Sequence, residues 1–547
     1  MSKKPAYLLV TCLTFAGLLL ASAKGRPSVA LTGIVSSSAE GVMEGVLVSA
    51  KRGTITVTVV SDKQGRYSFP ASRLMPGEYR LSIRAIGYEA ANPNLGATVD
   101  KGTTEVAIML KQTQDLSSQL TDAEWFMSIP GTHEQKVALY KSCVLCHTLT
   151  PVMKSQYDSA GWMATLVRMR NWSNLSAISK PVLSHKGEGT HPFEEGEFAK
   201  YLASINLSSK SKFDFELKTL PRPHGEDTKV IVTEYDLPRP DSQPHDVVMD
   251  TAEMAWYTDF SEGIVGRLNS LTGEVKEWQD PEVKPGYPGG FQEFEMDREG
   301  NLWFARHEFS SFGEFVTKDE KFMNWSVPPE YSTPKTLTTF LAIAPDKTIW
   351  LKDDPDRKVF RFNPATGGFA IFDQFPGGVS DKQRHGIYGV NTDSKGNEYG
   401  ADKESGTIVK IDAQTGKSTL YPTPTPDSGP RRMHIDSEDR LWIGEYYASK
   451  IAMFDTQSGK FQEWPHPIPF YGPYDVVRDK AGYVWTGGMS SDLVTRLDPR
   501  TGQFRMYLLP HLGANIRRVD VDNSTTPPTF WVGENHQAKI AKVEPLD

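Results

Sequence analysis

The stretch Asp297-Arg298-Glu299-Gly300-Asn301-Leu302-Trp303-Phe304 decides the fold, because variants of it recur from about residue 230 onward. Each copy has an aromatic residue followed three positions later by a mostly charged residue. The pairs are Trp256/Asp259, Trp303/Arg306, Trp350/Asp353, Tyr399/Asp402, Trp442/Glu445, Trp485/Gly488 and Trp531/Glu534. Successive aromatic residues lie 47, 47, 49, 43, 43 and 46 positions apart. A period in the forties with one buried aromatic residue per unit predicts a seven-bladed β-propeller.

The two ends of this segment indicate how the ring closes. The last repeat ends at Val543 and is one strand short, whereas Val230–Leu237 has the alternation of an outer strand and precedes the first repeat. We expect this N-terminal strand to complete the last blade, so that the propeller comprises residues 230–547.

The segment resembles the streptogramin (virginiamycin B) lyase family of seven-bladed propellers. The matching text is Leu237-Pro238, Pro244-His245-Asp246, Trp256-Tyr257-Thr258-Asp259 and Ile264-Val265-Gly266-Arg267. In that family a His that opens a blade strand faces a carboxylate 14 residues later, with a metal and a second His nearby. His245 and Asp259 keep this spacing, but Arg431 stands where a His would precede Glu445. The paired-His arrangement that lyase general-acid chemistry needs is therefore not reproduced, although a divalent metal at His245 and Asp259 fits the resemblance.

Polar residues open the predicted inner strands and are followed by polar companions at the ends of the next strands. The opening positions are His245, Gln292, Tyr388, Arg431, Tyr474 and either Arg517 or Arg518; the companions are Asp259, Arg306, Asp353, Asp402, Glu445 and Glu534. We expect both sets to face one mouth of the central channel, a natural concave site. His245, Asp259, Arg431 and Glu445 are the candidate catalytic residues, because they combine an imidazole, two carboxylates and a cation. The alternative to a binding or catalytic site is a hydrated channel whose charged side chains pair with one another and bind no ligand.

The sharpest chemical motif is Cys143-Val144-Leu145-Cys146-His147, in a region with helical patterning from 115 to 207. Two thiols three residues apart can each form a thioether to a haem vinyl group, and the adjacent His can bind the iron. A zinc site would need two further ligands, and a dithiol redox pair would need a βαβ setting that is not visible. The motif therefore predicts one covalent haem c, and the region resembles a mono-haem class I cytochrome c domain.

The second axial ligand of the haem iron is a separate prediction. Met169 lies 22 residues after His147 and shares a predicted helical face with Trp162, which would pack on the porphyrin. Thioether ligation is usual where a cytochrome holds a high potential. Met169 is the preferred ligand. The alternatives are Met163, His185, His191 or no second ligand from the protein.

The segment from 28 to 112 alternates short β-rich runs with Gly and Pro turns, which predicts a small β-sandwich. It resembles the carboxypeptidase regulatory-like domain. The matching pieces are Gly33-Ile34-Val35, Gly45-Val46-Leu47-Val48, Asp62–Phe69, Pro76-Gly77-Glu78-Tyr79 and Gly87-Tyr88. It contains no clustered His, Cys or carboxylates, so we expect a spacer or docking role.

The N-terminus and the composition indicate the compartment and the partners. Residues 1–23 read as a signal peptide, with Lys3 and Lys4 before an apolar run and Ala21-Ser22-Ala23 at its end, so the protein is expected in the periplasm or otherwise exported. No later run is apolar enough to span a membrane. A formal net charge of −8 without a long basic run argues against nucleic acid.

These patterns predict a multidomain, mainly β protein: signal peptide 1–23, sandwich 28–112, small all-α cytochrome c domain 115–207, linker 208–229 and propeller 230–547. The preferred function is electron transfer by the haem, coupled to binding or oxidation of a small-molecule substrate at the propeller channel, with a redox partner protein. Such a protein would be a periplasmic oxidoreductase. The alternative is a lyase-like or non-catalytic binding propeller whose haem acts as a sensor or docking element.

Overall fold

The computed structural model describes residues 29–173, 175–176, 181–183, 194–208, 210–282, 289–306, 310–332, 338–353, 358–375 and 385–547. The predicted signal peptide and the alternative ligands His185 and His191 lie outside these residues. Within them, no helix is long and apolar enough to cross a membrane. The predicted mainly-β class is confirmed, since 38 strands accompany five α-helices in the described chain.

Six blades of the propeller are four-stranded antiparallel sheets, each formed by consecutive strands. They are β12–β15 (Pro244–Met249, Met254–Asp259, Ile264–Asn269, Val275–Gln279), β16–β19 (Phe291–Met296, Leu302–Arg306, Ser311–Val316, Lys321–Ser326), β20–β23 (Thr338–Ile343, Ile349–Asp353, Lys358–Asn363, Gly368–Asp373), β24–β27 (Ile387–Thr392, Glu398–Asp402, Thr407–Ile411, Ser418–Pro422), β28–β31 (Pro430–Ile435, Arg440–Glu445, Lys450–Asp455, Lys460–Pro465) and β32–β35 (Pro473–Arg478, Val484–Gly488, Leu493–Asp498, Gln503–Leu508).

The seventh blade joins both ends of the propeller segment. It consists of β36 (Ile516–Asp522), β37 (Thr529–Glu534), β38 (Lys539–Pro545) and the N-terminal strand β11 (Val230–Asp236), which pairs antiparallel with β38. The innermost strands of neighbouring blades contact one another in sequence order, and β36 contacts β12. The ring therefore closes as the sequence predicts, with its last blade completed by the first strand.

In five of the seven repeats the aromatic residue is held by an aspartate six positions before it. Asp297 accepts backbone N–H bonds from Glu299 and Asn301 through one oxygen, and the indole of Trp303 donates to the other at 3.2 Å. The same Asp–Trp bond occurs at Trp256, Trp442 and Trp485. One side chain thus stabilises the turn and satisfies the buried indole, which explains the recurrence of the motif.

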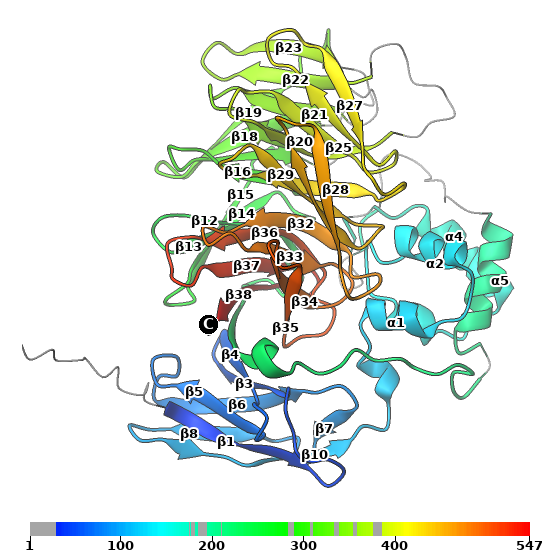
Figure 1. Ribbon diagram of the computed structural model, residues 1–547, viewed down its shortest axis with the longest axis vertical. Coiled ribbons are helices and arrows are strands. Elements are labelled where there is room, and N and C mark those ends of the chain that lie inside the picture. The colour runs from blue at the N-terminus through cyan, green and yellow to red at the C-terminus, as the bar shows by residue number, and fades with distance from the viewer. Residues whose placement is uncertain are drawn as a thin grey trace, which may run out of the picture.

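The N-terminal sandwich extends the seventh blade. Its strands are β1 (Val29–Ser37), β2 (Gly41–Val42), β3 (Leu47–Arg52), β4 (Ile55–Val60), β5 (Arg66–Pro70), β6 (Gly77–Arg84), β7 (Tyr88–Ala90), β8 (Gly96–Val99), β9 (Thr104–Glu105) and β10 (Ile108–Gln112). Strand β4 pairs antiparallel with the outer edge of β11, which gives one eight-stranded sheet in the order β36-β37-β38-β11-β4-β3-β6-β8. Figure 1 shows this sheet running from the red end of the propeller into the blue sandwich.

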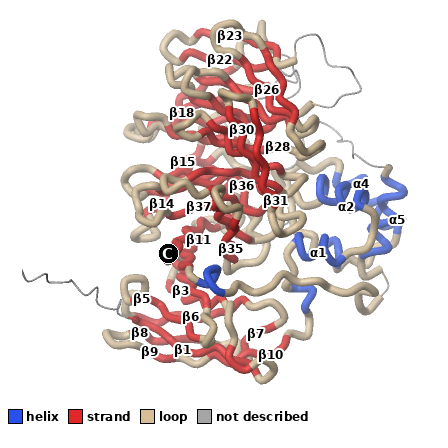
Figure 2. Tube along the Cα trace, viewed as in Figure 1, coloured by secondary structure: helices blue, strands red, loops and turns tan. Residues whose placement is uncertain are grey.

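A helical region lies against one face of the propeller, as Figure 2 shows. Its elements are η1 (Leu116–Ser118), α1 (Asp122–Ser128), α2 (His133–Ser142), α3 (Thr150–Met153), α4 (Ser159–Met169) and α5 (Glu195–Ile205), and η2 (Gly225–Thr228) follows in the linker. The predicted capping box is present, because Thr132 and Gln135 exchange side-chain and backbone hydrogen bonds. Helices α1 and α3 were not predicted; both are short.

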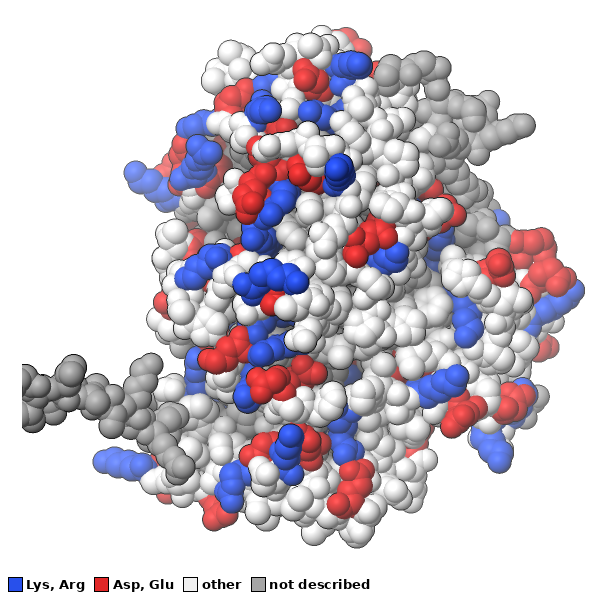
Figure 3. All heavy atoms as spheres, viewed as in Figure 1, with Lys and Arg blue, Asp and Glu red and all other residues white. Residues whose placement is uncertain are grey.

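Acidic and basic side chains alternate over the face drawn in Figure 3, across both the propeller and the sandwich, and do not separate by sign.

Candidate functional site

A bulge near the start of each inner strand shapes the channel mouth. The register shifts just after the first residue of β12, β16, β20, β24, β28, β32 and β36. Such a bulge re-aims the residue at that position. The second residues of these strands are His245, Gln292, Thr339, Tyr388, Arg431, Tyr474 and Arg517, so Arg517 rather than Arg518 takes the equivalent place in the last blade.

Five of these second residues form one buried polar group, here called the mouth cluster. Its members are His245, Tyr388, Arg431, Tyr474 and Arg517. The Tyr474 hydroxyl lies 3.1 Å from His245 Nε2 and 2.6 Å from the Tyr388 hydroxyl. Arg431 donates to the Tyr388 hydroxyl at 3.2 Å. Its guanidinium lies 4.6 Å from the Tyr388 ring centre and 4.2 Å from that of Tyr474, which places it in cation–π contact with both.

The helical region covers this mouth. Arg517 donates a 2.8 Å hydrogen bond to the Leu145 carbonyl, inside the Cys-x-x-Cys-His motif. Tyr140 of α2 stacks on Tyr446 of the propeller with ring centres 4.8 Å apart and donates to the Tyr446 carbonyl. Tyr446 in turn lies 4.4 Å from the Arg431 guanidinium. The motif therefore lies directly over the mouth cluster.

Two cations of the mouth cluster have no carboxylate partner among the described residues. Arg431 and Arg517 are 6% and 3% exposed and bond to a hydroxyl, a carbonyl, an amide oxygen and a sulfur. Burial lowers the pKa of Arg517. By contrast Arg432 and Arg518, one residue further along the same strands, both pair with Glu293. A buried charge without a counter-ion costs several kcal/mol, so the mouth is suited to an anionic group.

Two other groups of the cluster have displaced pKa values. Burial would raise the pKa of Tyr388, but the adjacent Arg431 and Arg432 outweigh it and lower this pKa to about 7. Burial lowers the pKa of His245 to about 3, against the opposing effect of Asp246, so its imidazole is neutral at pH 7. A neutral, fully buried imidazole is unsuited to act as a general acid.

The Cys-x-x-Cys-His motif follows α2 directly, with Cys143 as its C-cap. Both thiols are unbridged, and burial raises the pKa of Cys143 to about 12 and that of Cys146 to about 11. They are therefore protonated and weak nucleophiles, which disfavours a dithiol redox pair. His147 Nδ1 lies 2.8 Å from the Thr148 carbonyl. Because a carbonyl only accepts, Nδ1 carries the proton and Nε2 keeps its lone pair for a metal.

The predicted helix carrying Trp162 and Met169 is present as α4 (Ser159–Met169), but the two side chains differ in burial. Trp162 and Leu166 are buried, whereas Met169, at the end of α4, is 39% exposed. Met163 is half-buried and packs against the core of the helical region.

The predicted pairing of His245 with Asp259 is wrong. His245 bonds to Asp246 and Tyr474, whereas Asp259 accepts from Arg239 at 2.7 Å and from the Ser261 backbone at 2.9 Å. The bulge directs the opening residue into the mouth cluster, while the residue at the end of the second strand stabilises its own loop. No hydrogen bond or ion pair joins the two in the described chain.

The same correction applies to Arg431 and Glu445. Glu445 is fully buried within its blade, where burial and the neighbouring Glu463 raise its pKa to about 8. Two further companion positions also have partners outside the mouth cluster, because Arg306 pairs with Asp280 and Asp402 pairs with His385. The candidate catalytic residues thus divide into two that join the mouth cluster and two that do not.

A second polar layer lies next to the mouth cluster and was missed from the sequence. It comprises Asp246, Glu293, Arg432, His434, Asp475 and Arg518, linked by ion pairs such as Arg432–Glu293 at 3.0 Å and His434–Asp475 at 3.1 Å. These residues follow the opening positions by one or three places, a spacing that would have identified them. Because these acidic and basic groups pair with one another across several blades, the layer stabilises the ring.

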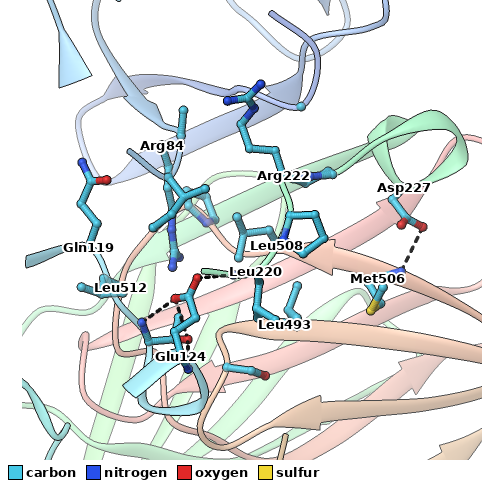
Figure 4. Close-up of a pocket in the computed structure, with 18 of the residues that line it drawn as sticks. Arg84, Gln119, Glu124, Leu220, Arg222, Asp227, Leu493, Met506, Leu508 and Leu512 are labelled. Carbon is cyan, nitrogen blue, oxygen red and sulfur yellow. Dashed lines mark hydrogen bonds between the residues drawn. The ribbon is translucent and has the colours of Figure 1, made fainter. Parts of the chain in front are cut away.

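A cavity of about 240 Å³ lies away from the mouth, where the sandwich, the linker and the propeller meet. Figure 4 shows Leu220, Leu493 and Leu508 on its wall, with Arg84 and Glu124 at its edge. Glu124 accepts hydrogen bonds from the Thr121 and Leu220 backbone. The cavity is therefore largely apolar, and its charged groups are already paired.

Two segments of the sequence match known families. Residues 377–546 match the virginiamycin B lyase family, and residues 30–111 match the carboxypeptidase regulatory-like domain. No curated protein sequence matches the chain.

Solved structures of lyases share the propeller fold. Virginiamycin B lyase from Staphylococcus aureus is 19% identical, with 57% of this chain and 99% of that chain covered and a TM-score of 0.50. A streptogramin B lyase structure is 19% identical, with 59% and 99% covered and a TM-score of 0.51. A catalytically inactive variant of the Staphylococcus aureus enzyme with Quinupristin is 18% identical, with 57% and 99% covered and a TM-score of 0.50. At these identities the likeness concerns the fold alone.

Proposed function

We propose that the helical region is a c-type cytochrome whose single covalent haem is held by Cys143-x-x-Cys146-His147 beside the mouth cluster. We further propose that the protein transfers electrons between a small molecule at the propeller and a redox partner in the periplasm. The observation that carries this proposal is the His147 imidazole, whose Nδ1 is bonded to the Thr148 carbonyl while Nε2 is left for iron. In this arrangement the two thiols would form the thioethers and His147 would be an axial ligand.

The mouth cluster supports the same proposal. A haem brings two carboxylates, and the mouth holds two buried guanidinium groups without carboxylate partners in the described chain, Arg431 and Arg517. Guanidinium–carboxylate pairs are strong where both groups are removed from water. These two residues would hold the haem carboxylates and exclude water from them. When bound, the haem supplies one-electron chemistry.

The first experiment tests whether haem is covalent. The protein is expressed with export and c-type haem maturation, and haem is detected in the denatured chain on a gel. We expect haem to stay with the wild-type chain and to be lost when Cys143→Ser and Cys146→Ser are combined. A wild-type chain that loses its haem on denaturation would overturn the proposal. Reduction of the bound haem by a panel of periplasmic metabolites then identifies the substrate.

The second experiment tests the distal ligand, for which we propose Met169. A large apolar side chain left 39% exposed at the end of α4 would be covered by the porphyrin. Met169→Ala is expected to abolish the far-red charge-transfer band of Met-ligated ferric haem and to lower the potential. Met163→Ala is the matched control and should change neither. Loss of the band in Met163→Ala alone would move the assignment to Met163.

Lyase-like chemistry is the second candidate, favoured by the propeller fold shared with the lyases. The neutral His245 and the engagement of Asp259 with Arg239 argue against it. We expect no opening of quinupristin by the full chain with Mg²⁺, measured by mass spectrometry. Ring opening that EDTA abolishes would replace electron transfer by lyase chemistry as the propeller's function.

A further inference from the structure

A second polar site lies in the seventh blade, outside the mouth cluster. Glu234 of β11, His511 of the loop after β35 and Glu534 at the end of β37 bring one imidazole and two carboxylates together, with one ligand atom from each within 4.8 Å of the others. His511 Nδ1 lies 2.6 Å from a Glu234 oxygen. The three residues come from three separate elements that meet only in the folded ring.

The two carboxylates are buried without the donors that usually accompany them. Glu234 and Glu534 are both fully buried, and neither Glu534 oxygen nor the second Glu234 oxygen accepts a hydrogen bond from an N–H group or a hydroxyl of the described residues. Ionised carboxylates removed from water cost several kcal/mol unless they are paired or bind a metal. The two carboxyl groups also hydrogen-bond to each other, so a cation bound between them and His511 would pair with both at once.

The nearest cations already have other partners. Lys539, which pairs in register with Glu534, forms its ion pair with Asp236. Arg84 of the sandwich donates to the Leu509 and His511 carbonyls and to Asp492 at 2.9 Å. These bonds hold the backbone of the His511 loop in place, while the imidazole itself bonds to Glu234.

We propose that Glu234, His511 and Glu534 bind a divalent transition-metal ion, with Zn²⁺ as the best match, and that this ion ties the ring-closing strand β11 to the rest of the seventh blade. One nitrogen and two carboxylate oxygens suit Zn²⁺, whose bonds to such ligands are about 2.0–2.2 Å long. Tetrahedral ligand atoms lie about 3.4 Å apart. In the present geometry all three lie within 4.8 Å and the His511 Nδ1–Glu234 pair lies at 2.6 Å, so each atom needs a shift of about 1 Å or less. The His511 side chain is 38% exposed, so it is free to make that shift and leaves a path for the ion.

The experiment measures metal in the full-length, haem-loaded protein by mass spectrometry and then titrates EDTA-treated protein with ZnCl₂. We expect about one equivalent of Zn²⁺ and a rise in melting temperature that grows with Zn²⁺ concentration. Glu534→Gln and His511→Ala should each weaken Zn²⁺ binding at least about tenfold and remove the rise. His511→Ala is the safer variant for folding, because that side chain is partly exposed.

Glu398→Gln is the matched control, since Glu398 is a fully buried carboxyl group with no hydrogen-bond partner among the residues that the structure describes, and it lies outside the metal cluster. It should bind Zn²⁺ like the wild type. Equal Zn²⁺ binding by wild type and Glu534→Gln would overturn the proposal and favour a proton shared between the carboxyls. Zn²⁺ that is lost only when Cys143 and Cys146 are replaced would place the ion at the haem motif and would also overturn it.

Discussion

Arg431 lies among aromatic rings from three different parts of the propeller. Tyr388 comes from the preceding blade, Tyr474 from the next one and Tyr446 from the loop at the end of its own blade's second strand. Sequence spacing suggested Glu445 as its partner, because both residues occur in one repeat. The bulge in the inner strand separates the two, since it turns Arg431 into the mouth cluster while Glu445 stays inside the blade.

The lowered pKa of Tyr388 gives a prediction at this scale. Because its pKa is about 7 in the folded protein and about 10 when unfolded, ionised Tyr388 stabilises the fold fully above about pH 10, and this contribution is lost as the pH falls through about 7. Ultraviolet difference spectra should therefore show one tyrosinate forming near pH 7. Tyr388→Phe should remove that step, whereas Tyr157→Phe, at an exposed site, should keep it. Spectra of the wild type without tyrosinate below about pH 9 would contradict the prediction.

The sequence predicts helix α2 but does not predict how this helix packs against the propeller. The capping box and the apolar residues predict the helix, and its start at His133 agrees with them. Its contact with the propeller depends on Tyr140, which stacks on Tyr446 and meets Phe470 edge-on with ring centres 5.6 Å apart. Both partners lie more than 300 residues away in the chain.

Tyr140→Ala tests this docking. Removal of a fully buried aromatic ring typically costs about 3–5 kcal/mol, so we expect a loss of that size in the free energy of unfolding measured with urea. Tyr157→Ala, in the same region but 45% exposed, should change it by less than about 1 kcal/mol. Equal stability of the two variants would show that the helical region is not held by this stack.

At the scale of the whole molecule, the seventh blade connects all the parts. Strand β11 pairs with β38 on one side and with β4 of the sandwich on the other. The helical region lies beside the propeller, as Figure 1 shows. An edge strand with unpaired backbone groups is a site for unwanted association. Covering β11 with β4 removes that edge, so the sandwich is part of the propeller's architecture and more than a spacer.

Arg84→Ala tests how firmly the sandwich is attached. Arg84 reaches from β6 to Asp492 and to two carbonyls of the propeller, so its removal leaves a buried carboxylate without its cation. We expect the free energy of unfolding to fall by about 2–4 kcal/mol. Arg80→Ala on the same strand, where the side chain is exposed, should have an effect within about 0.5 kcal/mol. An effect of Arg84→Ala as small as that of the control would mean that β4 and β11 alone hold the sandwich.

The sequence by itself determined the mainly β class, the propeller and its ring closure, the sandwich and the Cys143-x-x-Cys146-His147 motif, because these depend on local turn chemistry, hydrophobic alternation and short fixed spacings. Only the tertiary structure decided which polar residues meet. It brought His245, Arg431 and Arg517 together from separate blades, set Asp259 and Glu445 apart from them, and assembled Glu234, His511 and Glu534 at the ring closure. The physical reason is that a β-bulge sets the direction of a side chain, and the closed ring brings together residues that are hundreds of positions apart. The spacing of residues within one repeat predicts neither of these.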